Sequence, residues 1–441
     1  VIEGSGVASE EIVGLGLTGQ MHGAVLLDGT DTPIRPAMLW NDGRTGEQCD
    51  EIERRVGLDR LLAIAGNPAL TGFQAPKILW VRDHESEAYA RVQRVLLPKD
   101  YIRLLLTGDA ATDASDASGT LLLDLAARDW SDEILAALDI PRSWLPTVHE
   151  GPELTGHLRD DVAAELGLPA GLPVAAGGGD NAAAAVGTGI VREGFVSSSV
   201  GTSGVIFAHT DAFLPDPEGR LHAFCHAIPG KYHLMGVTLA AGGSFQWWRD
   251  LLDPETAFDA LTGNAATSAP GAEGLLFLPY LMGERTPHRD PLARGAFVGL
   301  TARHTKAHLT RAVMEGVIFS LRESLELMRD LGVEIDHVRA TGGGARDPLW
   351  RELQADIYRT PVHQMQVEEG PALGAALLAG VGAGVYDDVM AASETIQLRA
   401  GAQQPDPERA SRYDEVFALY RTLYPATVET MHALNDIVSS S

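Results

Sequence analysis

The chain has 441 residues, of which 45% are hydrophobic, and its formal net charge is −26 at pH 7. This length predicts two or more domains, and the strong negative charge excludes nucleic acid and anionic membranes as partners of the surface as a whole. No apolar run is long enough to cross a bilayer and no signal peptide is visible, so we expect a cytoplasmic protein. The two cysteines, Cys49 and Cys225, are too few for a disulfide framework or a zinc site, and we expect buried thiols.

Arginine supplies almost all of the positive charge. An acidic, lysine-poor surface suits a cytoplasm of high salt, where ions screen the repulsion between like charges. A GC-rich genome would produce the same preference for arginine, so both explanations stay open. The lysines are Lys77, Lys99, Lys231 and Lys306.

In chain order, the first informative stretch runs from residue 12 to residue 23. Its apolar part, residues 12–17, predicts a buried strand. Gln20, Met21 and His22 follow at the carboxyl end of that strand, which is where open α/β sheets bind their ligands. A histidine that merely packs at the strand end is the simpler alternative for His22.

The next polar stretches carry no clear catalytic signal. The run from Asp113 to Thr120 is rich in Asp, Ser and Gly and predicts a polar loop. Arg44 and Lys99 are interpreted as surface ions, and neither is assigned a role in a site.

Residues 172–186 hold the most informative turn of the chain. A buried strand, residues 172–176, breaks into three glycines and presents Asp180 and Asn181 before a helix of small residues. A glycine turn of this kind lets a ligand approach the backbone, and one carboxylate in it is placed to take a proton from a substrate hydroxyl. The alternative is that Asp180 only caps the helix.

The second half of the sequence repeats such turns. Residues 195–200 and 205–209 predict two strands joined by Gly201-Thr202-Ser203-Gly204, whose N–H groups and hydroxyls suit a phosphate. A helix opens near Gly242, and a strand at residues 337–341 runs into glycines 342–344 and a further helix. A long amphipathic helix is expected around residues 309–328, a helix of small residues from 370, and a helical tail from 408 to 437.

None of these turns is a Walker A loop or a dinucleotide-binding fingerprint. Each alone is weak, since glycine turns after strands are common. Together they predict two α/β halves that put glycine turns at strand ends and face each other over a cleft with one carboxylate. That arrangement suits phosphoryl transfer, in which catalysis is mostly positioning and neutralisation of charge.

The sequence resembles the FGGY family of carbohydrate kinases, from about residue 12 to residue 379. Within that family it is most similar to the members that phosphorylate D-xylulose. The resemblance implies two ribonuclease H-like domains of the actin/hexokinase ATPase type, flanking a catalytic cleft. It rests on Gly295 to Leu300, His308-Leu309, Ala312 to Glu315, Gly19 to Gly23, Leu39 to Arg44, Leu97 to Tyr101, Gly177 to Asn181 and Pro279 to His288.

The resemblance also implies roles for single residues. Asp180 would be the general base on the terminal hydroxyl of the sugar, and Met21, His22 and Asn181 would help to bind that sugar. Glycerol kinases have Arg-Glu at the positions of Met21 and His22, which argues against glycerol. No protein ligand for a metal is assigned, and Asp347 falls near an adenosine contact of the family. The implied ATP-binding residues are Thr202, Gly242, Gln246, Gly343 and Gly344.

Two departures from the family pattern stand out. Gln74 replaces the Pro, Ser or Thr expected before Lys77. The family's first strands and their Asp-x-Gly-Thr phosphate loop, roughly 50 residues, have no counterpart, so the chain looks truncated at its N-terminus. The expected domains are residues 1–172, which would bind sugar, and residues 173–441, which would bind ATP and end in the C-terminal helix.

The implied reaction is ATP- and Mg²⁺-dependent phosphorylation of D-xylulose to D-xylulose 5-phosphate. Another pentulose or polyol kinase is the alternative within the family. A non-catalytic sugar- or nucleotide-binding remnant, and an actin-like filament or chaperone ATPase, are alternatives from other classes. Whether the chain forms a homodimer stays open.

Overall fold

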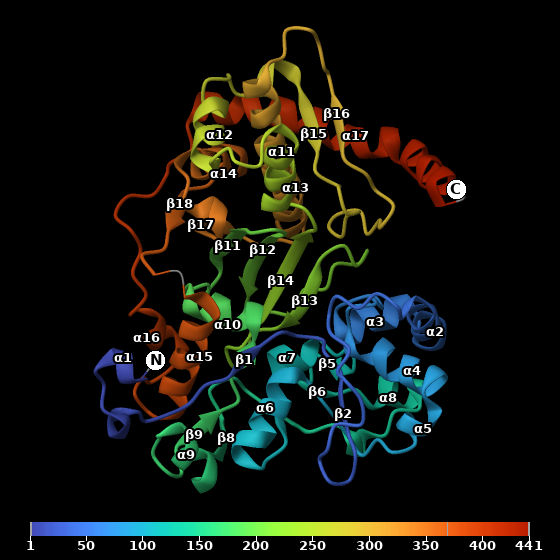
Figure 1. Cartoon of the computed structure of the whole chain (residues 1–441), viewed down its shortest axis with the longest axis vertical. Helices are drawn as coiled ribbons and strands as arrows, with labels where there is room; N and C mark the ends of the chain where they lie inside the picture. The colour runs from blue at the N-terminus through green and yellow to red at the C-terminus, as the bar shows by residue number, and fades with distance from the viewer. Residues whose placement is uncertain (1, 368, 440–441) are drawn as a thin grey trace. The chain divides into compact units, whose positions relative to one another are not determined.

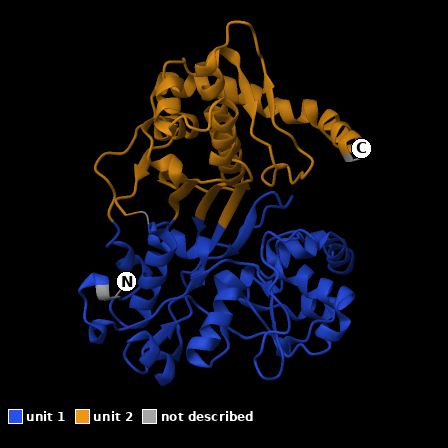
Figure 2. Ribbon diagram, viewed as in Figure 1, with its two compact units in different colours: residues 1–192, 209–233, 369–396 blue, residues 193–208, 234–368, 397–441 orange. Residues whose placement is uncertain are grey.

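The computed structural model describes residues 2–367 and 369–439. The chain forms two compact units, and each is assembled from segments that are distant in the sequence (Figure 2). Unit 1 holds residues 1–192, 209–233 and 369–396, and unit 2 holds residues 193–208, 234–368 and 397–441. Among the described residues, no helix has both the length and the apolar character needed to span a membrane. The predicted domain boundary after residue 172 stays a prediction.

Unit 1 combines many helices with short strands that pair mainly two by two (Figure 1). Its helices are α1 (Ile2–Ser5), η1 (Ser9–Glu11), α2 (Gly46–Val56), α3 (Leu58–Ala65), α4 (Gln74–His84), α5 (Ser86–Tyr89), α6 (Pro98–Thr107), α7 (Ala114–Ser118), α8 (Asp132–Leu138), η2 (Arg142–Trp144), α9 (Asp160–Leu166), α10 (Asp180–Gly187), α15 (Gly370–Gly382) and α16 (Val389–Ser393). Its strands are β1 (Thr18–Gly19), β2 (Val25–Leu27), β3 (Arg94–Leu96), β4 (Ala111–Asp113), β5 (Leu123–Asp124), β6 (Asp129–Trp130), β7 (Thr147–His149), β8 (Leu154–His157), β9 (Pro173–Ala175), β10 (Gly178–Gly179) and β13 (His222–Cys225).

The predicted strand at residues 12–17 is wrong. Within it only Leu15 forms a bridge, to Val174, and regular pairing starts at β1, which runs parallel to β10. The reason lies in the packing of α15, because a Cβ on Gly16 would come within 2.0 Å of the Ala375 carbonyl oxygen. The segment therefore lies against a helix instead of forming a long ladder.

Helices α10 and α15 pack with their backbones almost in contact. A Cβ on Gly187 would lie 1.9 Å from the Gly370 carbonyl oxygen, and one on Gly374 would lie 1.8 Å from that of Ala183. Only glycine permits so close an approach. The first residue of α10 is Asp180, so this helix pair fixes the start of the segment that carries it.

The predicted polar loop at residues 113–120 is also wrong, because the stretch forms the end of β4 and the buried helix α7. Asp113 caps that helix by accepting hydrogen bonds from the N–H groups of Ser115 and Asp116. The Ser118 hydroxyl donates to the Ala114 carbonyl at 2.7 Å. Polar side chains that satisfy one another in this way can be buried, which composition alone does not reveal.

Unit 2 is built on a mixed sheet with neighbouring strands in the order β14-β12-β11-β17-β18. Strand β11 is antiparallel to β12 and parallel to β17. The strands of unit 2 are β11 (Gly194–Val200), β12 (Gly204–Thr210), β14 (Tyr232–Thr238), β15 (Leu276–Leu278), β16 (Ala296–Val298), β17 (Ile335–Thr341) and β18 (Val362–Gln364). Its helices are α11 (Gly242–Leu252), α12 (Phe258–Ala265), η3 (Ala272–Gly274), α13 (Lys306–Asp330), η4 (Gly343–Ala345), α14 (Pro348–Tyr358) and α17 (Pro407–Ser439).

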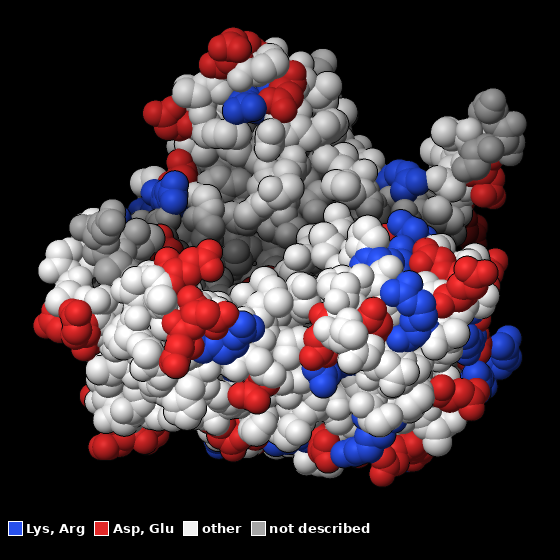
Figure 3. Space-filling view, turned by 60° about the horizontal axis from the view of Figure 1, so that its bottom comes forward, with Lys and Arg blue, Asp and Glu red and all other residues white. Residues whose placement is uncertain are grey.

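The core of unit 2 surrounds α13, which is buried along most of its length. The C-terminal helix α17 packs on it through Tyr413, Phe417 and Tyr420, and the Arg311 guanidinium donates to the Tyr413 hydroxyl at 2.7 Å. The sequence predicted both helices. On the face shown in Figure 3, acidic and basic side chains are interspersed, so the excess of acidic groups is not gathered there into one patch.

Candidate active site

Asp180 stands at the end of a tightly constrained turn in unit 1. Strand β10 pairs with β1 in parallel, so that Thr18 lies opposite Gly178 and Gly19 opposite Gly179. Gly177 has φ of +78°, and a Cβ on it would lie 1.9 Å from the Leu17 carbonyl oxygen. The turn therefore requires glycine there, and it delivers Asp180 as the first residue of α10.

The carboxylate of Asp180 is held by its own neighbour. Asp180 Oδ1 accepts hydrogen bonds from the Asn181 backbone N–H at 2.8 Å and from Asn181 Nδ2 at 3.1 Å. A capping side chain would bind N–H groups two or three residues further on, and Gly179 occupies the cap position. Burial raises the pKa of Asp180 while the bonds from Asn181 lower it, and the net pKa lies above its ordinary value. A more basic carboxylate is better suited to accept a proton.

Met21 and His22 lie beside this turn, as their position after β1 dictates. A Cβ on Gly179 would lie 2.8 Å from Met21 Cγ, so Met21 covers the residue before the carboxylate. His22 has φ of +72°, an uncommon conformation for a residue with a side chain, and such strain is characteristic of functional sites.

Contacts within unit 1 fix the His22 ring. Nδ1 lies 2.7 Å from the Gly119 carbonyl oxygen. A carbonyl only accepts, so Nδ1 carries the proton and Nε2 is an acceptor in the neutral ring. The Phe73 ring meets the His22 ring edge-on, at 4.9 Å between centroids. These two contacts therefore fix the orientation of the His22 ring.

A buried group of charged residues lies next to the turn, and none of them was assigned a role from the sequence. Lys99, interpreted as a surface ion, is buried: its side chain is 1% exposed, and Nζ lies 2.5 Å from Asp100 Oδ1, 3.0 Å from Asp113 Oδ1 and 3.7 Å from Asp116 Oδ2. Burial lowers the pKa of Lys99, but the three carboxyl groups raise it more, and the net pKa lies above its ordinary value. Arg44, by contrast, is 47% exposed and pairs with Asp42 at the surface.

The spacing of Asp113 and Asp116 was the one available signal for this group. Acidic residues three apart at the start of a helix suit a cap followed by an inward-facing carboxyl group. Burial raises the pKa of Asp116 well above its ordinary value, and Asp180 is one of the charges that raise it further. The charge of Asp180 therefore acts on the buried group through the carboxyl group of Asp116.

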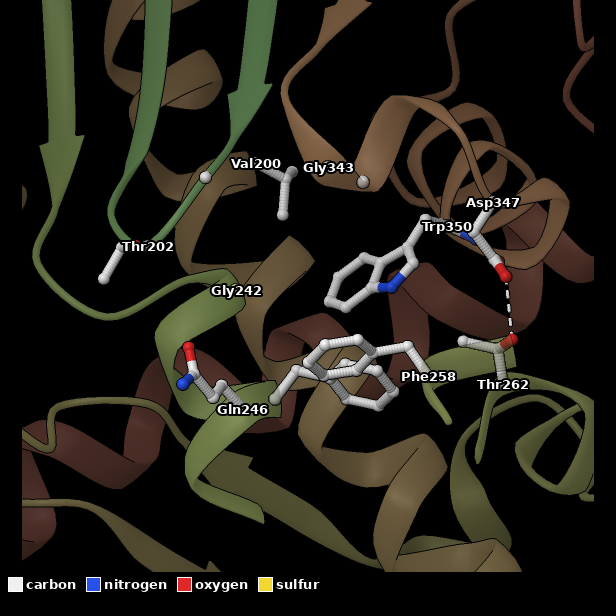
Figure 4. A pocket seen from close by; sticks show the side chains of 12 residues that line it. Val200, Thr202, Gly242, Gln246, Phe258, Thr262, Gly343, Asp347 and Trp350 are labelled. Atoms are coloured by element: carbon white, nitrogen blue, oxygen red, sulfur yellow. Dashed lines mark hydrogen bonds between the residues drawn. The ribbon is translucent and has the colours of Figure 1, made fainter. Parts of the chain in front are cut away.

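Unit 2 contains a cavity of about 330 Å³, within the roughly 300–1,000 Å³ of small-molecule sites. All five residues that the resemblance implies for ATP line it, together with Asp347. Figure 4 shows that they come from the β11–β12 turn, the start of α11, and the η4 and α14 region. The lining residues are Val200, Gly201, Thr202, Gly242, Phe245, Gln246, Phe258, Thr262, Gly343, Gly344, Asp347 and Trp350.

Three aromatic rings form one wall of this cavity. The Phe245 ring stacks on Phe258 at 5.7 Å between centroids and meets Trp350 edge-on at 5.6 Å. Beside them Thr262 Oγ1 donates to Asp347 Oδ2 at 2.7 Å, the contact dashed in Figure 4. Flat apolar rings next to a few polar groups suit a planar heterocycle.

At the opposite rim of the cavity, glycines allow neighbouring turns of the backbone to pack closely against one another. A Cβ on Gly242 would lie 2.5 Å from the Gly201 carbonyl oxygen, and one on Gly344 would lie 2.7 Å from Val200 Cβ. These positions require glycine so that the two turns can meet. At Gly343 an added Cβ has no neighbour nearer than 3.8 Å, which leaves its backbone open to a ligand. A rim of exposed backbone beside an aromatic wall fits a nucleotide.

Sequence reasoning missed the aromatic wall and Thr262. They come from three helices, and no short motif joins α11, α12 and α14. Among the described residues, no group of three or more His, Cys, Asp or Glu side chains is arranged to hold a metal ion.

The comparisons with known proteins agree with this geometry. Residues 1–187 match the N-terminal domain of the FGGY family of carbohydrate kinases, and residues 196–383 match its C-terminal domain. The chain belongs to this family, and it is a sugar kinase with the family's two-domain α/β fold.

Within the family, the chain is similar to xylulose kinases. The chain is 44% identical to a xylulose kinase of Escherichia coli (strain K12), over 96% of this chain and 86% of the relative. It is 42% identical to a xylulose kinase of Lactococcus lactis, over 96% of this chain and 85% of the relative. The crystal structure of a xyloylose kinase from Brucella ovis superposes with a TM-score of 0.89 at 41% identity, covering 96% of this chain and 85% of that one.

Proposed function

We propose that this chain phosphorylates D-xylulose with ATP and Mg²⁺, giving D-xylulose 5-phosphate and ADP. The observation that carries the proposal is the turn of unit 1, where Asp180 follows three glycines beside Met21 and His22. The similarity to xylulose kinases of several bacteria supports the choice of sugar. Cytoplasmic location stays a prediction, and whether the chain forms a homodimer stays open.

In the proposed reaction Asp180 accepts the proton of the sugar's terminal hydroxyl as that oxygen bonds to the γ-phosphorus of ATP. The bond from that phosphorus to the β,γ-bridging oxygen breaks, and ADP leaves. Asn181 holds Asp180 Oδ1 through two hydrogen bonds, which leaves Oδ2 to face the hydroxyl. Nε2 of His22 accepts a hydrogen bond from another hydroxyl of the sugar, and Met21 excludes water from the turn.

The cavity of unit 2 is the proposed site for ATP. Its aromatic wall fits the base, and the glycine rim around Thr202 and Gly343 fits the phosphates. Gly242, Gln246 and Gly344 complete the proposed contacts. Mg²⁺ would be held largely by the phosphates of the nucleotide and by water, with few protein ligands, and would neutralise phosphate charge during the transfer.

The test is an assay coupled to ADP release with Mg-ATP, in low and in multimolar KCl. D-xylulose, D-ribulose, glycerol and no sugar are compared. Turnover that depends on D-xylulose supports the proposal, whereas preference for another sugar identifies a different kinase of the family. ATP hydrolysis at the same rate with and without sugar, or no turnover with any sugar, contradicts the proposal.

Asp180→Asn tests the role of the base in the same assay. The amide keeps the shape of the side chain but accepts no proton, so we expect turnover to be lost while D-xylulose binding by calorimetry remains measurable. Turnover at the wild-type rate would refute the assignment.

A further inference from the structure

A continuous chain of buried polar groups connects Lys99 to the backbone of the Asp180 turn. Lys99 Nζ lies 3.0 Å from Asp113 Oδ1, and the other carboxylate oxygen, Oδ2, accepts a hydrogen bond from the Ser115 hydroxyl. Ser115 Oγ accepts in turn from the N–H of Gly179 at 3.1 Å. Gly179 directly precedes Asp180, so the chain ends one residue from the proposed base.

The chemistry of these groups allows only one direction for the chain. The Ser115 hydroxyl has a single proton, and that proton is donated to the Asp113 carboxylate. The lone pairs of Oγ then face the Gly179 N–H, which only donates. Lys99 Nζ contacts the opposite oxygen of this carboxyl group, Asp113 Oδ1, at 3.0 Å, so Asp113 lies between the lysine and the Ser115 hydroxyl.

A further buried residue, Arg103, holds the neighbouring backbone. Arg103 Nη2 donates to the carbonyl oxygens of Ala175 and Ala176, at 2.5 and 3.0 Å. Ser115 Oγ also lies close to Gly178, 3.4 Å from where a Cβ on that residue would stand. Strand β10 has only two residues, so sheet pairing alone gives this turn few constraints.

We propose that Ser115, oriented by Asp113 and Lys99, is a positioning residue that holds the Gly178-Gly179 backbone and thereby aims Asp180 at the substrate hydroxyl. The inference rests on the proposed function, because it assigns Asp180 the role of base. It predicts that loss of the Ser115 hydroxyl lowers the rate of the chemical step without weakening sugar binding in proportion. A displacement of about 1 Å at a reacting group costs up to about a hundredfold in rate.

The test compares Ser115→Ala with Ser118→Ala. Both serines lie in α7, are buried and lose one hydroxyl, but the Ser118 hydroxyl bonds the Ala114 carbonyl and the Cys225 N–H instead of the turn. We expect kcat of Ser115→Ala to fall about tenfold, with KM for D-xylulose and for ATP changed less than threefold. Ser118→Ala keeps kcat within twofold, even where its melting temperature falls equally. Equal kcat values in the two variants overturn the proposal.

Hydrogen–deuterium exchange of the unliganded protein gives a readout that does not depend on turnover. We expect Ser115→Ala to speed exchange of the peptide covering residues 176–182 about tenfold, and Ser118→Ala to leave it unchanged. Equal exchange in both variants overturns the proposal even where the protein turns over no sugar. The wild type and Asp180→Asn are measured in parallel, so that failure of the proposed reaction is recognised separately.

Asp113→Asn is the second variant if Ser115→Ala does not fold. Asparagine has one acceptor oxygen, whereas Lys99 lies on one side of the group and the Ser115 hydroxyl and the N–H groups of Ser115 and Asp116 lie on the other, so contacts on one side are lost whichever way the amide is turned. We expect a fall in kcat smaller than for Ser115→Ala and larger than for Ser118→Ala. A kcat equal to that of the wild type overturns the role of the chain.

Discussion

Gly119→Ala tests the sugar-binding role of Met21 and His22 most directly. A Cβ on residue 119 would lie 2.7 Å from His22 Nδ1, closer than Cβ atoms come to their neighbours, and 3.0 Å from Met21 Cε, a tight contact that the end of that side chain relieves by shifting. The backbone at Gly119 has φ of −73° and ψ of 2°, a conformation that alanine adopts without strain. The substitution therefore displaces the two side chains while it leaves the local backbone acceptable.

The size of the effect follows from the contacts that are lost. The His22 ring has to move away from the Gly119 carbonyl oxygen, to which Nδ1 donates at 2.7 Å. Loss of such a bond costs about 1 kcal/mol, and displacement of the sugar-facing nitrogen adds a comparable amount. A total of about 1–2 kcal/mol corresponds to a fall in kcat/KM for D-xylulose of about five- to thirtyfold. KM for ATP should not change, because the cavity lies in unit 2.

Steady-state kinetics with D-xylulose and with ATP varied in turn measure both effects. Gly46→Ala is the matched control, since this glycine begins α2 and an added Cβ there has no neighbour within 4 Å. A kcat/KM for D-xylulose within twofold of the wild type in Gly119→Ala would refute the reasoning. An equal fall in both variants would show that the loss does not come from His22 and Met21.

Three further predictions concern the nucleotide cavity, a buried acid and the thiols. Thr262→Val removes the hydroxyl that donates to Asp347 Oδ2, so we expect KM for ATP to rise about three- to tenfold with KM for D-xylulose unchanged, and equal changes in both would contradict it. Burial raises the pKa of Glu323 to about 8. Between pH ~4.5 and 8 the folded chain therefore keeps a proton that the unfolded chain has lost. The free energy of unfolding then falls by about 1.4 kcal/mol per pH unit as the pH rises through this range. Glu323→Gln lacks this slope, so the free energy of unfolding of the variant relative to the wild type should rise with pH in urea titrations, and a constant difference would show that Glu323 is not protonated. Burial raises the pKa of Cys49 to about 12 and that of Cys225 to about 11, so neither thiol should react with Ellman's reagent at pH 8 until urea unfolds the chain, and rapid labelling of the folded chain would refute their burial.

The sequence by itself determined the turns that carry the candidate site. Gly177 and Gly342 each follow a strand, and this local pattern survives folding because both residues have a positive φ and an added Cβ would lie within 3 Å of a backbone carbonyl oxygen. The strand–turn–helix at Asp180 and the β11–β12 hairpin were predicted for this reason. The long helix α13 was predicted from periodicity, which is also a local property.

Only the tertiary structure decided the role of the polar residues between these turns. Asp113, Ser115 and Lys99 look like loop and surface residues because their composition is polar, yet they are buried against one another. A charge is stable inside a protein only when partners from elsewhere in the chain compensate it, and a sequence window does not contain those partners. The cavity wall of Phe245, Phe258 and Trp350 was missed for the same reason, since three separate helices bring these rings together. Structure that depends on one segment alone can be predicted from the sequence. Contacts that need side chains from two or more distant segments exist only after folding.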